Sequence, residues 1–269
     1  MTDPEREFDF DFNQRGLQGK TLVLAGGSGG LGSAVAALLA RDGASLVLGY
    51  RQDRERAARL QAHLGRFGRG VELVQGDIAE AATREACVQA AERIGEEIYG
   101  LVCLAGDPAR VRFDDADLAD LDASMRQNYY GPILLARDFG IRLQRSGTSG
   151  AIVLFSTMQA VDLFPSSINY AAPKAALIHA ARILAKQWGG PSGIRVNVIA
   201  PGVNRAGMAL ASIRSGKYDP FVERGIIPRF GRAEDVAKAV RFLVEPDNYI
   251  TGQVLTVDGG LTLRKDLKS

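Results

Sequence analysis

Short apolar runs alternate with longer segments of helical periodicity along most of the chain. The runs lie at residues 21–25, 45–48, 71–74, 100–104, 151–155, 194–199 and 254–257. They are nearly continuous in hydrophobic residues, which is typical of strands buried on both faces of a parallel sheet. The pattern therefore predicts one mainly parallel, seven-stranded sheet.

The segments between these runs have the spacing of helices. We expect helices over 31–41, 53–64, 83–94, 169–188 and 233–244, and helical segments within 115–145. Strands that alternate with helices through right-handed crossovers build a doubly wound α/β fold. The chain of 269 residues is typical of one such domain.

We therefore divide the chain into an N-terminal extension, residues 1–18, and a single domain, residues 19–269. The extension contains the alternation Phe8-Asp9-Phe10-Asp11-Phe12, which leaves open an edge strand, an arm on a neighbouring subunit or a tail. Residues 204–228 fit the rhythm poorly and predict a mobile excursion.

Composition narrows the class of protein. Hydrophobic residues make up 46% of the chain and the formal net charge is only +2, so we expect a large core and no nucleic-acid partner. Two cysteines and two histidines supply neither a disulfide framework nor a metal site. The acidic N-terminus and the absence of a long apolar stretch predict a soluble, cytoplasmic protein without a membrane partner.

A glycine-rich turn follows the first predicted strand and opens the first predicted helix. Glycines let the backbone approach a pyrophosphate, and the helix N-terminus offers free N–H groups. A bare structural turn is the alternative, but the strand–turn–helix position favours dinucleotide binding in a Rossmann-type fold. The candidate residues are Gly26, Ser28, Gly30, Leu31 and Gly32.

The end of the second strand distinguishes the two nicotinamide cofactors. An acid there binds a ribose hydroxyl, whereas an arginine accommodates a 2′-phosphate. The chain has Tyr50 and Arg51 at this point, and no acid until Asp53. We therefore favour NADP(H), with NAD(H) possible, although Arg51 can also be read as a solvated residue of a charged helix.

Tyr170 and Lys174 lie one helical turn apart. A nearby ammonium favours the phenolate and lowers the pKa of a tyrosine. Such a tyrosine can exchange a proton with an alcohol or carbonyl oxygen while hydride moves to or from a nicotinamide. Taken alone, a tyrosine and a lysine at this spacing are common, and an ordinary amphipathic pair is then the better interpretation.

An ordered set of motifs makes the chain resemble the classical short-chain dehydrogenases/reductases over about residues 18–262. The set comprises the glycine-rich turn, Gly76-Asp77-Ile78, Ala105-Gly106, Asn128, Tyr170 with Lys174, Pro201-Gly202-Val203, and the closing segments Gly231 to Val236 and Thr251 to Gly260. Each piece is weak, but their order is specific.

The resemblance implies a role for each position. Tyr170 would be the acid/base. Lys174 would lower its pKa and hold the nicotinamide ribose, and Asn128 would position Lys174 and a proton-relay water. Asp77 and Ile78 would border the adenine, Ala105 and Gly106 would belong to the cofactor site, and Pro201, Gly202 and Val203 would contact the nicotinamide. A homo-oligomer, tetramer or dimer, is also implied.

The sequence departs from the family pattern at three places. Thr157 stands where the family has its catalytic serine, and Ser156 is the alternative. Cys103-Leu104 replaces two asparagines, and we expect a buried inert cysteine rather than a reactive thiol. Ala25 and Ala206 replace threonines, which predicts a lower cofactor affinity.

We expect an oxidoreductase that transfers hydride between the nicotinamide and a small carbonyl or alcohol substrate. A 3-oxoacyl-thioester and a small ketone or sugar are both open as substrates. The three departures motivate the alternative of a catalytically weak nucleotide-binding sensor or scaffold. Substrate choice is expected in residues 204–228, which Gly207, Gly216 and Gly225 would let move. Met158 and Phe164 are expected near the pocket mouth.

Overall fold

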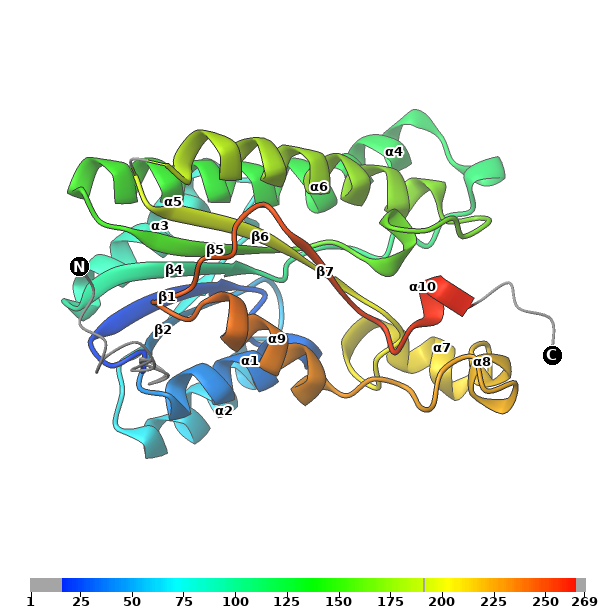
Figure 1. Cartoon of the computed structure of the whole chain (residues 1–269), viewed down its shortest axis with the longest axis horizontal. Coiled ribbons are helices and arrows are strands. Elements are labelled where there is room, and N and C mark those ends of the chain that lie inside the picture. Colours follow the sequence, from blue (N-terminus) through cyan, green and yellow to red (C-terminus); the bar gives the residue numbers. More distant parts are fainter. Residues whose placement is uncertain (1–15, 191, 265–269) are drawn as a thin grey trace, which may run out of the picture.

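Seven parallel strands form a single sheet at the centre of the molecule (Figure 1), in the order β3-β2-β1-β4-β5-β6-β7. The computed structural model describes residues 16–190 and 192–264. The strands are β1 (Lys20–Ala25), β2 (Ser45–Tyr50), β3 (Val71–Gln75), β4 (Glu97–Cys103), β5 (Gly150–Phe155), β6 (Ile194–Pro201) and β7 (Val254–Val257). Every pairing is parallel, which confirms the predicted doubly wound Rossmann-type sheet.

Helices cover both faces of this sheet. One face carries α3 (Ala81–Ile94), α5 (Gly131–Ser146) and α6 (Ile168–Trp188), and the other carries α1 (Gly30–Arg41), α2 (Arg54–Leu64) and α9 (Ala233–Leu243) (Figure 1). Short 3₁₀ turns lie at Gly65–Phe67, Phe113–Asp115, Met158–Ala160 and Gly207–Ala209. The expected alternation of strands and helices is thus observed.

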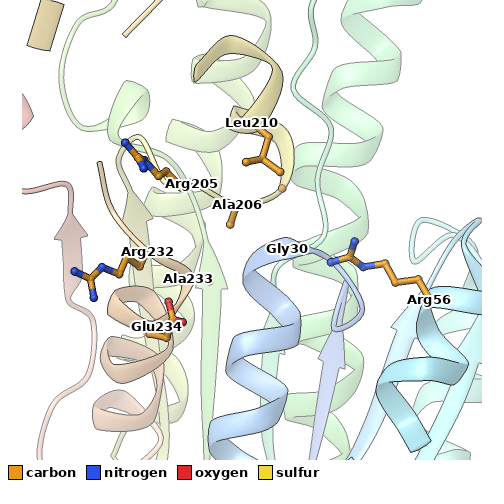
Figure 2. Close-up of a pocket in the computed structure, with 9 residues that line it drawn as sticks. Gly30, Arg56, Arg205, Ala206, Leu210, Arg232, Ala233 and Glu234 are labelled. Atoms are coloured by element: carbon orange, nitrogen blue, oxygen red, sulfur yellow. The ribbon is translucent and has the colours of Figure 1, made fainter. Parts of the chain in front are cut away.

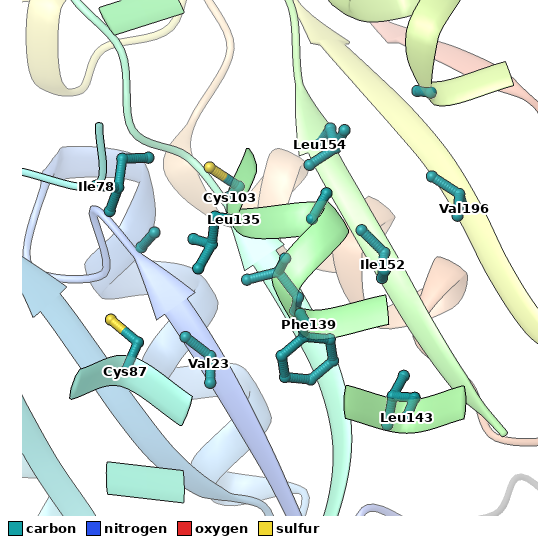
Figure 3. Packing of buried hydrophobic residues seen from close by; sticks show 14 of the residues in the cluster. Val23, Ile78, Cys87, Cys103, Leu135, Phe139, Leu143, Ile152, Leu154 and Val196 are labelled. Carbon is teal, nitrogen blue, oxygen red and sulfur yellow. The ribbon is translucent and has the colours of Figure 1, made fainter. Parts of the chain in front are cut away.

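Two apolar cores lie on the two sides of the sheet. Side chains of β1, β4 and β5 that point to one face, such as Val23 and Ile152, pack against Phe139 of α5 (Figure 3). Those that point to the other face, such as Leu22 and Val153, pack against α1 and α9. Because the strands are covered on both faces, nearly every position in them is apolar, and this caused the continuous runs in the sequence.

The helical region expected within 115–145 is divided into three parts. α4 (Leu118–Met125) begins at Asp117, whose side chain accepts from the backbone N–H of Asp120 in a capping box. A π-helical turn, Arg126–Tyr130, then joins α4 to α5. Such turns insert an extra residue into a helix and are frequent at functional sites; this one carries Asn128.

The segment 204–228 is not the free excursion that we expected. It contains α7 (Leu210–Arg214) and α8 (Asp219–Glu223), and α10 (Leu261–Arg264) lies beside them (Figure 1). Ile226, Ile227 and Phe230 form a small third core with Met158 and Leu261. Its apolar residues come from the segment after α8 and from separate segments around Met158, Val203 and Leu261. They share no regular period, so the sequence pattern did not reveal this packing.

The two ends of the chain lie largely outside the described residues. The predicted Phe8 to Phe12 alternation is among the residues not described. Leu17 is fully buried and its N–H donates to the Asp42 carbonyl, so the chain is already part of the domain there. Within residues 16–190 and 192–264, no helix is long and apolar enough to cross a membrane.

Candidate functional site

The loops that follow the strands meet at one edge of the sheet, because parallel strands all end on the same side. The chain turns away from this edge at Gly26, Arg51, Gly76, Gly106 and Ser156, each just after a strand. The strand order reverses between β1 and β4, and ligands of open α/β sheets bind in the crevice at such a reversal. The topology therefore brings nearly all of the predicted site residues to one crevice.

The glycine-rich turn joins β1 to the N-terminus of α1. Gly26 has φ +80°, in the left-handed region that favours glycine, and a Cβ on Gly32 would collide with the Gly26 carbonyl. No side chain caps α1, and its first turn holds no acidic residue. The free N–H groups of this helix, beginning with those of Gly30 and Leu31, can therefore bind an anion.

A pocket of about 500 Å³ adjoins this turn (Figure 2). Gly30 lies at its base, Arg56 reaches it from α2, and Arg205 and Arg232 lie across it. The Arg56 Nε also donates to the Ser28 carbonyl at 2.6 Å, which fixes the guanidinium against the turn. Glu234 is the one acidic group in the lining, so the hollow carries positive charge beside the helix N-terminus.

The ends of β2 and β3 form a second part of the crevice. The exposed Arg51 donates from Nη1 to Gln127 Oε1 at 3.0 Å, and Gln127 Nε2 donates to Asp77 Oδ2 at 2.8 Å. Hydrogen bonds from Ala79 and Gln127 hold the pKa of Asp77 below its usual value, against the effect of burial. Tyr50 and Ile78 are buried in the same region.

Asp53, the first acid after β2, is used elsewhere. Its side chain accepts a hydrogen bond from the backbone N–H of Arg56 and caps α2. The capping role accounts for an aspartate at this position, so no contact with a ribose is needed to explain it. The end of β2 therefore offers an arginine, and not a carboxylate, to a bound ribose.

Tyr170 lies in the first turns of α6, next to the end of β5. Burial, the largest effect, and the Asp107 carboxylate raise the pKa of its phenol to about 12, while interaction with the Thr157 side chain favours the ionised form. The Ser156 hydroxyl points elsewhere and donates to the Lys174 backbone carbonyl at 3.0 Å. The geometry thus pairs Thr157, and not Ser156, with the tyrosine.

Lys174 lies one turn further along α6 and is only 2% exposed. Its ammonium donates to the Phe155 carbonyl at 2.8 Å, and burial lowers its pKa to about 8. We expected this ammonium to lower the pKa of Tyr170. Its hydrogen bond holds the ammonium at the end of β5, and with a pKa of about 8 the amine is already neutral at the pH where the Tyr170 phenol titrates.

Asn128 is fully buried in the π-helical turn. Its Nδ2 donates to the Asp107 carbonyl at 2.9 Å and to Ser124 Oγ at 3.1 Å, while its Oδ1 accepts from the Asp107 N–H at 3.0 Å. It therefore fixes the backbone after β4, and no direct hydrogen bond to Lys174 is observed. A Cβ on Gly106 would lie 2.9 Å from Asn128 Oδ1 and 3.0 Å from Lys174 Nζ, so Gly106 lies between the two.

The segment after β6 closes the other end of the crevice. The Gly202 N–H donates to the Val257 carbonyl at 3.0 Å, and Val203 is buried in the third core. The chain continues to Gly207, whose backbone lies against Gly30. Pro201 to Ala206 thus runs from the sheet to the glycine-rich turn.

Several other residues that the sequence singled out are packed against neighbouring side chains. Cys103 is buried, and burial raises the pKa of its thiol to about 11, which fits the inert cysteine that we expected. Met158 and Phe164 belong to the third core rather than to an open mouth. Arg205 lies over the ring of Phe230.

Sequence reasoning missed three residues of this crevice. Asp107 follows Ala105-Gly106 directly, Gln127 precedes Asn128, and Arg56 is one of several arginines on a charged helix. Only the position of Asp107 and Gln127 beside motif residues could have singled them out. Arg56 carries no such signal, since its role depends on the contact with Ser28.

The residues present fit a dinucleotide. The glycine-rich turn has no room for a side chain at Gly32, and the helix N-terminus after it has no cap. Thr157 follows β5 and Arg51 follows β2, so both lie at the same edge of the sheet as this turn. This arrangement can hold phosphates, bind a ribose and give a proton to an oxygen atom.

Comparisons with known proteins agree with this geometry. Residues 25–262 match the family described as enoyl-(acyl carrier protein) reductase. The chain is 32% identical over 253 residues to 2-(S)-hydroxypropyl-CoM dehydrogenase 3 of Xanthobacter autotrophicus, covering 91% of this chain and 98% of that protein.

Two solved structures are similar in fold. A short-chain type dehydrogenase/reductase from Mycobacterium ulcerans superimposes with a TM-score of 0.85 at 27% identity, covering 93% of this chain and 92% of the other. A short chain dehydrogenase from Burkholderia cenocepacia, in complex with NADP, has a TM-score of 0.78 at 34% identity and coverages of 91% and 99%.

Burial of the Lys174 ammonium predicts a pH-dependent cost in stability. Because its pKa is about 8 when folded and 10.5 ordinarily, the unfolded chain binds more protons between these values, and stability rises with pH across this window. The free energy of unfolding of Lys174→Met should therefore be about 1 to 3 kcal/mol higher than that of the wild type at pH 7. This range already subtracts the contribution of the lost hydrogen bond to Phe155.

Denaturant unfolding of both proteins between pH 7 and pH 10 measures this difference. It should shrink as the pH rises above about 8, since the wild type then buries a neutral amine. If the difference in free energy of unfolding between the two proteins stays constant from pH 7 to pH 10, burial of the Lys174 ammonium does not destabilise the fold.

Proposed function

We propose that this chain, which belongs to the short-chain dehydrogenase/reductase family, reduces a carbonyl group of a small molecule with NADPH. The family makes it an oxidoreductase. The observation that carries the proposal is the interaction of the Thr157 side chain with the Tyr170 phenol, one helical turn before the buried Lys174. Thr157 follows β5, at the same edge of the sheet as the glycine-rich turn.

The two hydroxyls would act on the substrate oxygen. A bound nicotinamide supplies the hydride. Thr157 would donate a hydrogen bond to the carbonyl oxygen, and Tyr170 would transfer its proton to that oxygen as negative charge develops. Since burial and Asp107 raise the pKa of Tyr170 to about 12, the phenol is protonated at neutral pH and ready to act as the acid.

Residues outside the acid pair would bind and orient the dinucleotide. The N–H groups at the start of α1, with Gly30 and Leu31, would bind the pyrophosphate. Lys174 would hold the nicotinamide ribose, and its pKa of about 8 keeps part of it neutral near physiological pH. Pro201 to Val203 would border the nicotinamide, and Asp77 with Ile78 the adenine.

NADPH is proposed over NADH because of the end of β2. The guanidinium of Arg51 is exposed and donates to the neutral side chain of Gln127, and Asp53, the acid nearest in sequence, caps α2. A guanidinium binds a phosphate through paired hydrogen bonds. The structural neighbour from Burkholderia cenocepacia, 34% identical, is in complex with NADP, which supports the same choice.

A nucleotide-binding sensor is the second candidate. The replacement of two asparagines of the family pattern by Cys103 and Leu104 favours it. Ala206 also lacks the hydroxyl that the family pattern has at this position. The two candidates differ in their behaviour with NADPH. A sensor would show a higher melting temperature when NADPH binds but would reduce no carbonyl compound.

Replacing Tyr170 by Phe should lower kcat/KM for carbonyl reduction by at least about 100-fold, because it removes the proton donor. The measurement is NADPH oxidation with a panel of ketones and aldehydes. The dissociation constant for NADPH should change little, which a fluorescence titration checks. Equal activity of the variant and the wild type would contradict the mechanism.

Replacing Thr157 by Val should lower kcat/KM by roughly 10- to 100-fold, because one hydrogen bond to the developing charge is lost. Thr157→Ser keeps the hydroxyl and should retain most of the activity. Full activity in Thr157→Val together with an inactive Ser156→Ala would assign the role to Ser156 instead.

Replacing Arg51 by Gln should raise KM for NADPH by roughly 10- to 100-fold and leave KM for NADH nearly unchanged, since only NADPH has the 2′-phosphate. Arg54→Gln is the matched control, because Arg54 is also exposed and lies one turn further on. An equal effect of Arg51→Gln on both cofactors would remove Arg51 from this role.

A further inference from the structure

Pro173 lies inside α6, between Tyr170 and Lys174. In an α-helix the N–H of the residue at this position would donate to the carbonyl of Asn169, four residues earlier. A proline has no N–H, and its ring crowds that same carbonyl. Because Asn169 is buried, its carbonyl needs a donor from outside the helix to replace the missing one.

Ser124 of α4 supplies this donor. Its hydroxyl is buried and donates to the Asn169 carbonyl. A hydroxyl has one hydrogen, so the second bond of this serine is one that it accepts, from Asn128 Nδ2 at 3.1 Å. The bonds therefore run in one direction, from Asn128 to Ser124 and from Ser124 to Asn169, and an apolar residue at position 124 would remove a partner from each asparagine.

The same serine closes a ring of hydrogen bonds around the loop that follows β4. Asn128 holds one end of this loop through the backbone N–H and carbonyl of Asp107. The side chain of Asn169 holds the loop further on, because its Nδ2 donates to the Val111 carbonyl at 2.9 Å. Ser124 joins the two asparagines, so the π-helical turn, the loop and the start of α6 are fixed to one another.

The position of Tyr170 depends on this ring. Tyr170 follows Asn169 directly, in the first turn of α6. The bond that the proline removes is one that would join this first turn to the second turn, which carries Lys174. The contact with Ser124 replaces that bond, while the Ser156 hydroxyl holds the second turn through the Lys174 carbonyl at 3.0 Å. The helix is thus attached to its surroundings on both sides of the phenol-bearing residue.

We propose that Ser124 is a positioning residue for the reaction: its hydroxyl replaces the helical hydrogen bond that Pro173 removes and thereby fixes the Tyr170 phenol for proton transfer. This inference rests on the proposed carbonyl reduction. Misplacement of a reacting group by about 1 Å is enough to slow a reaction strongly. The residues proposed to bind the pyrophosphate and the 2′-phosphate follow β1 and β2, outside the ring, so NADPH binding should depend little on Ser124.

Four full-length proteins test the inference: the wild type, Ser124→Ala, Pro173→Ala and the double variant. Ser124→Ala should lower kcat for carbonyl reduction roughly 10-fold, while the dissociation constant for NADPH stays within about twofold. Pro173→Ala restores an N–H that can donate to the Asn169 carbonyl. In that background Ser124→Ala should therefore lower kcat by about threefold or less, because the two substitutions act on the same bond.

Ser45→Ala is the matched control. Ser45 is also buried, and its hydroxyl accepts from the Gly70 N–H at 3.2 Å, but it begins β2 and so lies at the opposite edge of the sheet. This control should lower the melting temperature and leave kcat unchanged. Thermal unfolding of the first four proteins measures the bond without any substrate: Ser124→Ala should lower the melting temperature less when Pro173 is also replaced.

The outcomes separate this inference from the proposed function. If the wild type reduces carbonyl compounds but Ser124→Ala keeps full kcat, or loses as much kcat with Pro173 replaced as without, the inference is overturned while carbonyl reduction stands. If Ser124→Ala does not fold, the double variant should fold, and its failure to do so would also overturn the inference. If no protein of the set reduces a carbonyl compound, the proposed function fails and the positioning role with it, whereas the melting temperatures still test the bond.

Discussion

The buried ammonium of Lys174 is the constraint around which the site is arranged. A charge that is withdrawn from water needs a compensating partner, and here the partner is the carbonyl of Phe155 at the end of β5. The hydroxyl of the next residue, Ser156, bonds to the Lys174 backbone, so strand and helix are joined twice. This junction fixes α6 against the sheet edge and with it the position of Tyr170, one turn earlier.

The same arrangement determines the electrostatics of the acid. With the ammonium directed at Phe155, the groups that act on Tyr170 are burial and Asp107, which raise its pKa, and Thr157, which lowers it. A protonated phenol suits the donation of a proton.

Asn128 and Asp107 extend this rigidity to the next strand. Asn128, in the π-helical turn, makes three hydrogen bonds to Asp107 and Ser124. Ala109, which has a strained φ of +43°, follows shortly after Asp107. A site that holds side chains in place by such contacts gives up some stability for a fixed geometry.

The sequence by itself determined the parallel sheet, the order of its elements and most of the crevice. Apolar runs buried on both faces and the glycine-rich turn are local patterns, and parallel strands then bring their ends to one edge without further information. The Lys174 contact, the choice of Thr157 over Ser156 and the roles of Gln127, Arg56 and Asp107 were decided only by the tertiary structure. Each depends on which hydrogen-bonding groups from distant segments come into contact, such as Arg51 with Gln127. A local pattern of residue types does not specify these contacts, because several groups of the same kind are available along the chain.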